Sequence, residues 1–108
     1  MFKKFSVLLL SLSAAFALIA CSTAQQHYVL GQQYFHAQNY LNAFKEINTA
    51  AQQGNINAQY ALGYMYINGI GTQADNTAGL FWIKQAAAKG QPQAKKALKM
   101  LTSPQQPS

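Results

Sequence analysis

The sequence lacks arginine and is poor in acidic residues. All eight basic residues are lysines, and Glu46 and Asp75 are the only two carboxylates in the 108-residue chain. Nucleic-acid recognition normally depends on arginine, which makes bidentate contacts with phosphates and bases, so we expect no nucleic-acid partner. Acid–base catalysis needs titratable groups in perturbed environments, and two carboxylates leave almost none to spare. We therefore expect no enzyme, with Glu46 facing solvent and Asp75 capping a helix.

Metal ligands are equally scarce. His27 and His36 are nine residues apart (36 minus 27), so they do not share a helix face at ligand spacing. No histidine or carboxylate beside them completes a metal site. The single cysteine, Cys21, cannot form a disulfide within the chain. The sequence predicts no metal and no cofactor, with both histidines at the surface or at an edge of the packing.

Residues 1–20 have the pattern of an export signal. Lys3 and Lys4 precede an apolar segment, Phe5–Ala20, which is short for a membrane span and suits a secretory signal. It ends in Leu18-Ile19-Ala20-Cys21, which resembles the bacterial lipobox. The resemblance implies diacylglyceryl transfer to the Cys21 sulfur, cleavage before Cys21, and acylation of the new amino terminus.

An ordinary signal peptide cut after Ala15-Phe16-Ala17 is the alternative. We favour lipidation, and two or more acyl chains would anchor the protein stably to a membrane. Ser22 follows the cysteine, and resemblance to Gram-negative lipoproteins implies that a residue other than aspartate at this position favours export to the outer membrane, facing the periplasm, if the host is Gram-negative. Residues 21–26 are predicted to be the lipidated cysteine and a short polar linker, which would keep the domain close to the bilayer.

A helix–loop–helix hairpin organises the segment Asn57–Gly90. Apolar residues share one face on each of two helices: Ala58, Leu62 and Met65 on the first, and Leu80, Ile83 and Ala87 on the second. Gly69 and Gly71 lie between them and allow backbone angles that a helix forbids. Gly63 is costly in the middle of a helix, so we expect a close approach of the second helix there, at Ala78 and Ala86.

The same segment resembles a Sel1-like repeat, a relative of the tetratricopeptide repeat with a longer loop between its two helices. The signature positions that carry the resemblance are Leu62, Gly63, Tyr66, Gly69, Gly71, Trp82, Ala86 and Gly90. The resemblance implies an α-solenoid that acts as an adaptor or scaffold for other proteins, with no general catalytic residues.

Internal repetition supports this interpretation independently. A shift of 36 residues places Ile47 on Ile83 and Leu62 on Leu98, and a shift of 32 places Tyr34 on Tyr66. The difference corresponds to a four-residue insertion at the glycine loop. Periods in the mid-thirties are typical of solenoid repeats.

The predicted fold is all-α, a short α-solenoid of about five helices made of two helical hairpins and a capping helix. The repeat domain is predicted over residues 27–101, followed by a disordered tail at 102–108. The helices are expected at about 27–37, 40–52, 56–67, 76–88 and 92–101.

The first helix of each unit is expected to line a concave groove that holds a partner. By analogy with tetratricopeptide-like solenoids, the groove positions are Tyr28, Gln32, Phe35, Asn57, Tyr60, Tyr64, Ile67 and Lys96. Aromatic and amide side chains suit recognition of an extended peptide or a helix. Tyr60 and Tyr64 could instead be buried in the small core. The end near Tyr28 and Tyr40 could pair with a second molecule, so the oligomeric state stays open.

Two functions follow. The first is a membrane-anchored lipoprotein that acts as a protein–protein adaptor in the cell envelope, binding an unidentified envelope protein or peptide. The second is an envelope-structural role, in which Lys95, Lys96 and Lys99 bind peptidoglycan or an anionic membrane surface. The same lysines could also be a solvated face that covers the open end of the solenoid.

Overall fold

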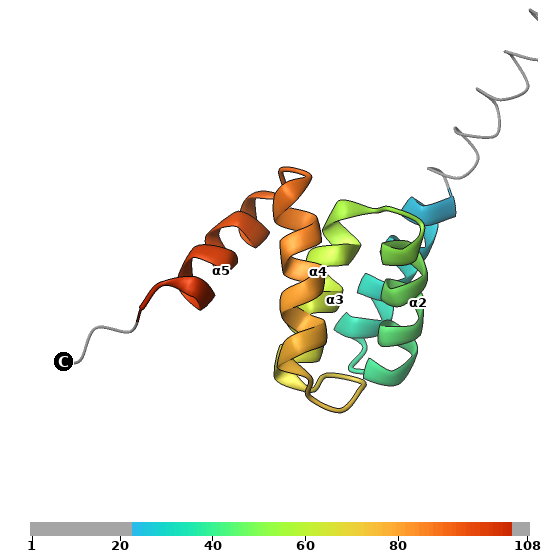
Figure 1. The fold of residues 1–108 in the computed structure, drawn as a ribbon. Helices are drawn as coiled ribbons and strands as arrows, with labels where there is room; N and C mark the ends of the chain where they lie inside the picture. The colour runs from blue at the N-terminus through green and yellow to red at the C-terminus, as the bar shows by residue number, and fades with distance from the viewer. Residues whose placement is uncertain (1–22, 105–108) are drawn as a thin grey trace, which may run out of the picture.

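Five helices form the part of the chain, residues 23–104, that the computed structural model describes. An N-terminal helix covers residues 23–36 and pairs with α2 (Tyr40–Gln52), and α3 (Ile56–Asn68) pairs with α4 (Asn76–Ala88). The last helix, α5 (Pro92–Thr102), leaves the top of α4 and projects from the body (Figure 1). The predicted all-α solenoid of two helical hairpins and one further helix is confirmed.

The ends of the repeat domain differ from the prediction. Residues 23–26 were expected in a linker but are helical, and Ala24 is buried, so they belong to the packed domain. Thr102, expected in the tail, is the last residue of α5. The predicted signal at 1–20, Cys21 and residues 105–108 lie outside the described residues. Within residues 23–104, no helix is both long and apolar enough to span a bilayer.

Each labelled helix begins at a side-chain cap. The cap residues are Asn39, Asn55, Asp75 and Gln91, and the side-chain oxygen of each accepts a hydrogen bond from the backbone N–H three residues later. The capping role predicted for Asp75 is confirmed, with Oδ1 3.0 Å from the Ala78 nitrogen. The α3 helix ends at Gly69, whose φ of 65° is the left-handed conformation that glycine adopts readily.

The core forms two apolar clusters. The first joins α2 to α3 and contains Ala43, Ile47, Ala50, Ala51, Ala58, Leu62 and Met65. The second joins α4 to α5 and contains Ile83, Ala86, Ala87 and Ala94. Alanine predominates in both clusters, so the helices can approach closely, and partly buried aromatic residues such as Tyr66 and Trp82 pack around the first cluster.

The closest approach of α3 and α4 occurs between Gly63 and Gly79. A Cβ atom added to Gly63 would lie 2.8 Å from the Gly79 carbonyl oxygen, and one added to Gly79 would lie 2.9 Å from the Gly63 carbonyl oxygen. The predicted crossing at Gly63 is therefore present, but its small partner is Gly79 rather than the predicted Ala78 and Ala86.

The glycine loop closes the same hairpin against the first repeat. Gly71, with a φ of 71°, packs its backbone against the carbonyl of Tyr40 at the start of α2. Tyr66 meets Phe44 edge to face, with ring centroids 5.3 Å apart. The loop insertion that distinguishes the second unit from the first is thus a contact between the units.

Amide side chains join the beginnings of successive first helices. Asn55 Nδ2 donates to Gln25 Oε1 at 3.0 Å, and Gln91 Nε2 donates to Asn57 Oδ1 at 3.3 Å. Asn55 and Gln91 are 36 residues apart, and Gln25 and Asn57 are 32 apart, so these are the same contact in two successive units. We call this pair of hydrogen bonds the amide clamp. It uses Asn57, which the sequence had placed in the partner groove.

We predict that Gly63→Ala lowers the free energy of unfolding. Its methyl group would lie 2.6 Å from Ile83 Cγ1. Overpacking costs roughly 1–3 kcal/mol, and we expect the upper end because the backbone carbonyl of Gly79 also lies 2.8 Å from the added methyl group. The gain in helix propensity of about 1 kcal/mol offsets part of that cost, so we expect a net loss of about 2 kcal/mol. Urea denaturation followed by the fluorescence of Trp82, the single tryptophan, measures the change. The control is Gln85→Ala on the exposed side of α4, which should be close to neutral. Equal stability of the two variants would contradict the close contact.

Candidate functional site

Two apolar hollows lie on either side of α3. The N-terminal hollow, of about 210 Å³, lies between the N-terminal helix and α3 and is lined by Tyr28, Gln32, Phe35, His36, Ile47, Ala61 and Met65. The C-terminal hollow, of about 240 Å³, lies between α3 and α5 and is lined by Tyr60, Tyr64, Ile67, Asn68, Ile83, Ala97, Met100 and Leu101. The first helix of each unit therefore provides most of the lining.

The two hollows are repeats of one another. A shift of 32 residues places Tyr28 on Tyr60, Gln32 on Tyr64, Phe35 on Ile67 and His36 on Asn68. A shift of 36 places Ile47 on Ile83, Ala61 on Ala97 and Met65 on Leu101. Every lining position of the N-terminal hollow thus has its counterpart in the C-terminal hollow.

Six of the eight predicted groove residues lie in these hollows. Tyr28, Gln32 and Phe35 line the first, and Tyr60, Tyr64 and Ile67 line the second. Asn57 is instead engaged in the amide clamp. Lys96 is exposed on α5, and its side chain is not part of the lining of either hollow. The structure thus brings the aromatic positions together in the two hollows and leaves out Asn57 and Lys96.

The N-terminal hollow is partly closed by contacts among its own side chains. Gln32 Nε2 donates to the Tyr28 hydroxyl at 3.0 Å, and the Phe35 ring packs edge to face on Tyr40, with centroids 5.3 Å apart. Burial raises the pKa of Tyr28 because desolvation disfavours the phenolate, and the hydrogen bond from Gln32 opposes this shift. This hollow therefore presents a largely apolar surface with one amide and one imidazole side chain.

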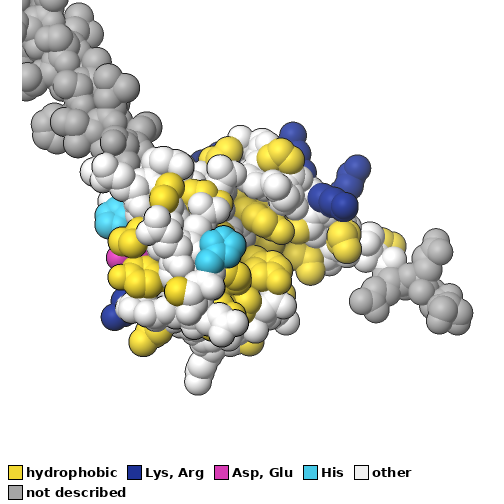
Figure 2. All heavy atoms as spheres, turned by 180° about the vertical axis from the view of Figure 1, so that it is seen from behind, with side chains coloured by type: hydrophobic (Ala, Val, Ile, Leu, Met, Phe, Trp, Pro, Cys, Tyr) yellow, Lys and Arg dark blue, Asp and Glu magenta, His cyan; other side chains and the backbone are white. Residues whose placement is uncertain are grey.

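The side chains that line the C-terminal hollow are more exposed to solvent than those of the N-terminal hollow. Tyr64 is 46% exposed, Met100 70% and Leu101 50%. Tyr60 and Ile67 are half-buried against the second core cluster. The sequence left open whether Tyr60 and Tyr64 lie in the groove or in the core. In the structure Tyr64 is exposed, whereas Tyr60 is half-buried and contacts both the core cluster and the hollow. Figure 2 shows hydrophobic side chains gathered across this rear face, between the body and the projecting helix.

Several lining residues were missed by sequence reasoning. The N-terminal hollow also uses His36, Ile47, Ala61 and Met65, and the C-terminal hollow also uses Asn68, Ile83, Ala97, Met100 and Leu101. The 32- and 36-residue shifts of the repeat align all of these residues except Met100 in pairs, and this is the signal in the sequence that identifies them.

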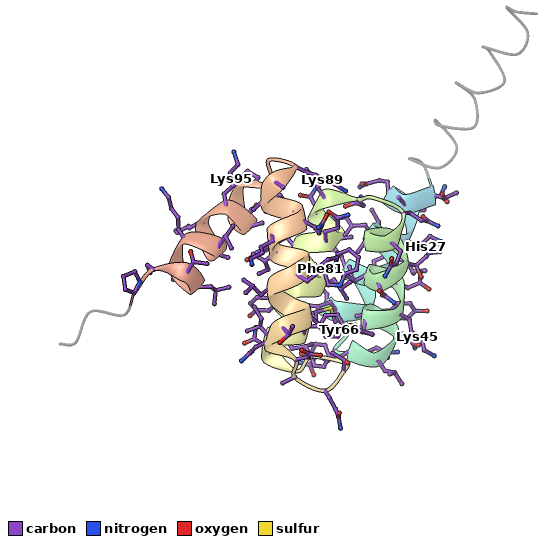
Figure 3. All side chains as sticks on the ribbon, in the orientation of Figure 1. His27, Lys45, Tyr66, Phe81, Lys89 and Lys95 are labelled. Carbon is purple, nitrogen blue, oxygen red and sulfur yellow. The ribbon has the colours of Figure 1, made fainter. Side chains whose placement is uncertain are left out.

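One polar pair was not expected. His27 Nδ1 lies 2.6 Å from Glu46 Oε2, and the two side chains are 38% and 25% exposed, so Glu46 does not simply face solvent as predicted. The pair ties the N-terminal helix to α2 on the side where Figure 3 shows His27. Among residues 23–104 no group of three or more histidine, cysteine or carboxylate side chains could hold a metal ion.

Comparison with known proteins identifies the repeat. The family model for the Sel1 repeat matches residues 56–91, which run from the first residue of α3 to the cap of α5. A crystal structure of a Sel1 repeat protein from Oxalobacter formigenes superposes with a TM-score of 0.70 at 35% identity, over 72% of this chain and 24% of that one. Residues 56–91 form a Sel1 repeat. The resemblance on the signature positions Leu62, Gly63, Tyr66 and Trp82 is thereby confirmed.

The curated relatives are much longer proteins. Chitin synthase regulatory factor 3 of Schizosaccharomyces pombe is 38% identical over 71 residues, which are 66% of this chain and 8% of that protein. The ERAD-associated E3 ubiquitin-protein ligase component HRD3A of Arabidopsis thaliana is 38% identical over 56 residues, 51% of this chain and 8% of that protein. Sel1 repeats mediate protein–protein interaction, and proteins that carry them are generally scaffolds rather than enzymes.

We predict that Tyr28 ionises above the ordinary tyrosine pKa of about 10. A raised folded-state pKa means that the neutral phenol contributes stability below the ordinary value, and this contribution is lost as the pH rises through the folded pKa. Tyrosinate absorbance is followed during an alkaline titration of the wild-type protein and of Tyr28→Phe. The difference between the two curves should be a single step above the ordinary value. A difference step at or below the ordinary value would refute the assignment.

Proposed function

We propose that this Sel1-repeat chain is a membrane-anchored bacterial lipoprotein that acts as an adaptor in the cell envelope. Its two equivalent hollows hold an extended segment or a helix of a protein partner that runs across α3. In a Gram-negative host the anchor would place it at the outer membrane, facing the periplasm. The observation that carries the adaptor function is the repetition of one apolar hollow in two successive units.

The chemistry of the hollows favours a protein partner over a charged surface. The lining residues of both hollows are apolar, aromatic, amide or imidazole side chains, and none is a lysine, aspartate or glutamate. Apolar and aromatic positions repeated along a groove bind peptides through alternate side chains or a helix face. A binding site for peptidoglycan or an anionic membrane would instead present cations.

The anchor is supported by the sequence alone. Leu18-Ile19-Ala20-Cys21 follows a basic and apolar segment, and Cys21 is the single cysteine. The packed domain begins by residue 23, only two residues after Cys21, so an acylated Cys21 would hold the solenoid against the bilayer. The partner would therefore be an envelope protein that reaches the same membrane surface.

We predict that Cys21→Ser abolishes lipid attachment. In a bacterial host, the wild-type protein should carry covalent acyl chains, detected by mass spectrometry, and should sediment with membranes. The serine variant should carry no acyl chain, because the thiolate of cysteine is the acceptor. Cleavage after Ala17 and the absence of lipid in the wild-type protein would instead show that the chain carries an ordinary signal peptide.

Photocrosslinking tests the adaptor function. A photoreactive residue at Tyr64, in the C-terminal hollow, should give a discrete protein adduct in the native envelope, identified by mass spectrometry. The matched control is Phe81, an aromatic residue of α4 that is 53% exposed and lies elsewhere on the molecule (Figure 3). It should not give this adduct. Tyr60→Ala and Tyr64→Ala should abolish capture of the same partner, because both remove aromatic surface from the hollow.

Other outcomes would overturn the proposal. Adducts only with lipid or glycan would favour the envelope-structural function through Lys95, Lys96 and Lys99. The same adduct from Tyr64 and Phe81 would show that contact does not depend on the hollow.

A further inference from the structure

A third hollow lies between α4 and α5, on the opposite face of α5 from the C-terminal hollow. It measures about 500 Å³ and is lined by Lys84, Ala87, Ala88, Lys95, Leu98, Lys99 and Thr102. On α5 its residues follow the spacing 95, 98, 99, 102, whereas Ala97, Met100 and Leu101 of the C-terminal hollow lie on the other face of the helix. We call it the lysine groove.

The lysine groove has a covered counterpart one unit earlier. A shift of 36 residues places Ala87 on Ala51, Leu98 on Leu62 and Lys99 on Gly63. In that earlier groove, between α2 and α3, Ala51 is 1% exposed and Leu62 is fully buried. The helix that lies against it is α4, whose Ile83 and Gly79 meet Gly63. Within residues 23–104 no helix covers the lysine groove. The lysine groove therefore has the position and shape of a groove that is covered by a helix one unit earlier.

The lysine groove carries charged side chains where its counterpart carries uncharged residues. Lys84, Lys95 and Lys99 stand where the earlier groove has Asn48, Gln59 and Gly63. All three lysines are exposed, and they lie along both walls, Lys84 on α4 and the other two on α5. Figure 3 shows Lys95 extending outward from α5. The floor between them stays apolar, with Ala87 at 8% exposure and Leu98 half-buried.

We propose that the lysine groove is a second interaction surface, which binds an amphipathic helix of another protein whose apolar stripe is flanked by acidic residues. The apolar floor takes the stripe, as the earlier groove takes α4. The lysine stems lie along the sides of the helix, and their ammonium groups pair with its carboxylates. Charge complementarity of both walls fixes the class of partner.

A second copy of this chain does not have that chemistry. The chain has two carboxylates, and Glu46 is paired with His27 while Asp75 caps α4. The formal net charge is +6, so copies repel one another. Lys99 replaces the glycine that allows α3 and α4 to approach closely, so any helix in the lysine groove would lie farther from α5 than α4 lies from α3.

A designed peptide provides the test. The probe is a labelled helical peptide of about 14 residues with leucines at i, i+3, i+4 and i+7 and glutamates on both sides of that stripe. Its binding to the purified protein is measured by fluorescence anisotropy over a salt series. The control peptide carries lysines in place of the glutamates.

The chain supplies a matched pair of variants. The groove variant changes Lys84, Lys95 and Lys99 to Gln, and the control variant changes Lys45, Lys89 and Lys96 to Gln, so both lose the same charge. These side chains are exposed, and circular dichroism verifies that both variants are folded. We expect the groove variant to weaken binding roughly tenfold and the control variant less than about threefold, with both effects shrinking as salt rises.

Three results would overturn the proposal. The first is failure of the glutamate peptide to bind. The second is equal weakening by the two variants, which would indicate attraction to the net charge alone. The third is loss of binding to phosphatidylglycerol vesicles in the groove variant without any effect on the peptide, which would assign the lysines to the membrane. Tyr64→Ala, at an exposed position that does not pack against the second core cluster, should leave peptide binding unchanged. Failure of peptide binding is therefore distinct from failure of the adaptor function.

Discussion

The close backbone contact between α3 and α4 is the constraint on which the rest of the structure depends. Gly63 and Gly79 bring the two helices together so that each carbonyl lies where the other residue's side chain would be. This contact positions Ile83 and Ile67 across the crossing, and Ile83 then belongs both to the second core cluster and to the C-terminal hollow. The cost of glycine within a helix is therefore offset by the interface that carries the candidate site.

The repeat explains why a small domain has several surfaces of related shape. Each unit contributes one helix to the hollows and one helix that covers the preceding groove, so every interior surface recurs after 32 or 36 residues. What changes between copies is the side chains. The N-terminal hollow has Gln32 where the C-terminal hollow has Tyr64, and the lysine groove has Lys99 where its counterpart has Gly63. The same interior surface is therefore built with different side chains in successive units of one fold.

The sequence predicted the helices and their order well, because glycines, caps and the repeat period mark them locally. It was less successful where a residue's role depends on its neighbours in space. Asn57 was expected to face a partner, but the hydrogen bond from Gln91, 34 residues later, engages it in the amide clamp. Glu46 was expected to face solvent, but His27 lies 19 residues earlier on the adjacent helix. Gly79 could not be distinguished from Ala78 as the contact, since the rotation of a helix with small residues on several sides is set by tertiary packing.

The shared wall between the two hollows has a consequence for affinity. Ala61 and Met65 face one hollow, Tyr60 and Tyr64 face the other, and all four are carried by α3. A segment that fills one hollow is therefore held beside the second at a high effective concentration, and its second contact is intramolecular. Two weak contacts of this kind multiply rather than add in the binding constant. A short solenoid can in this way discriminate a partner that carries the motif twice from the many that carry it once.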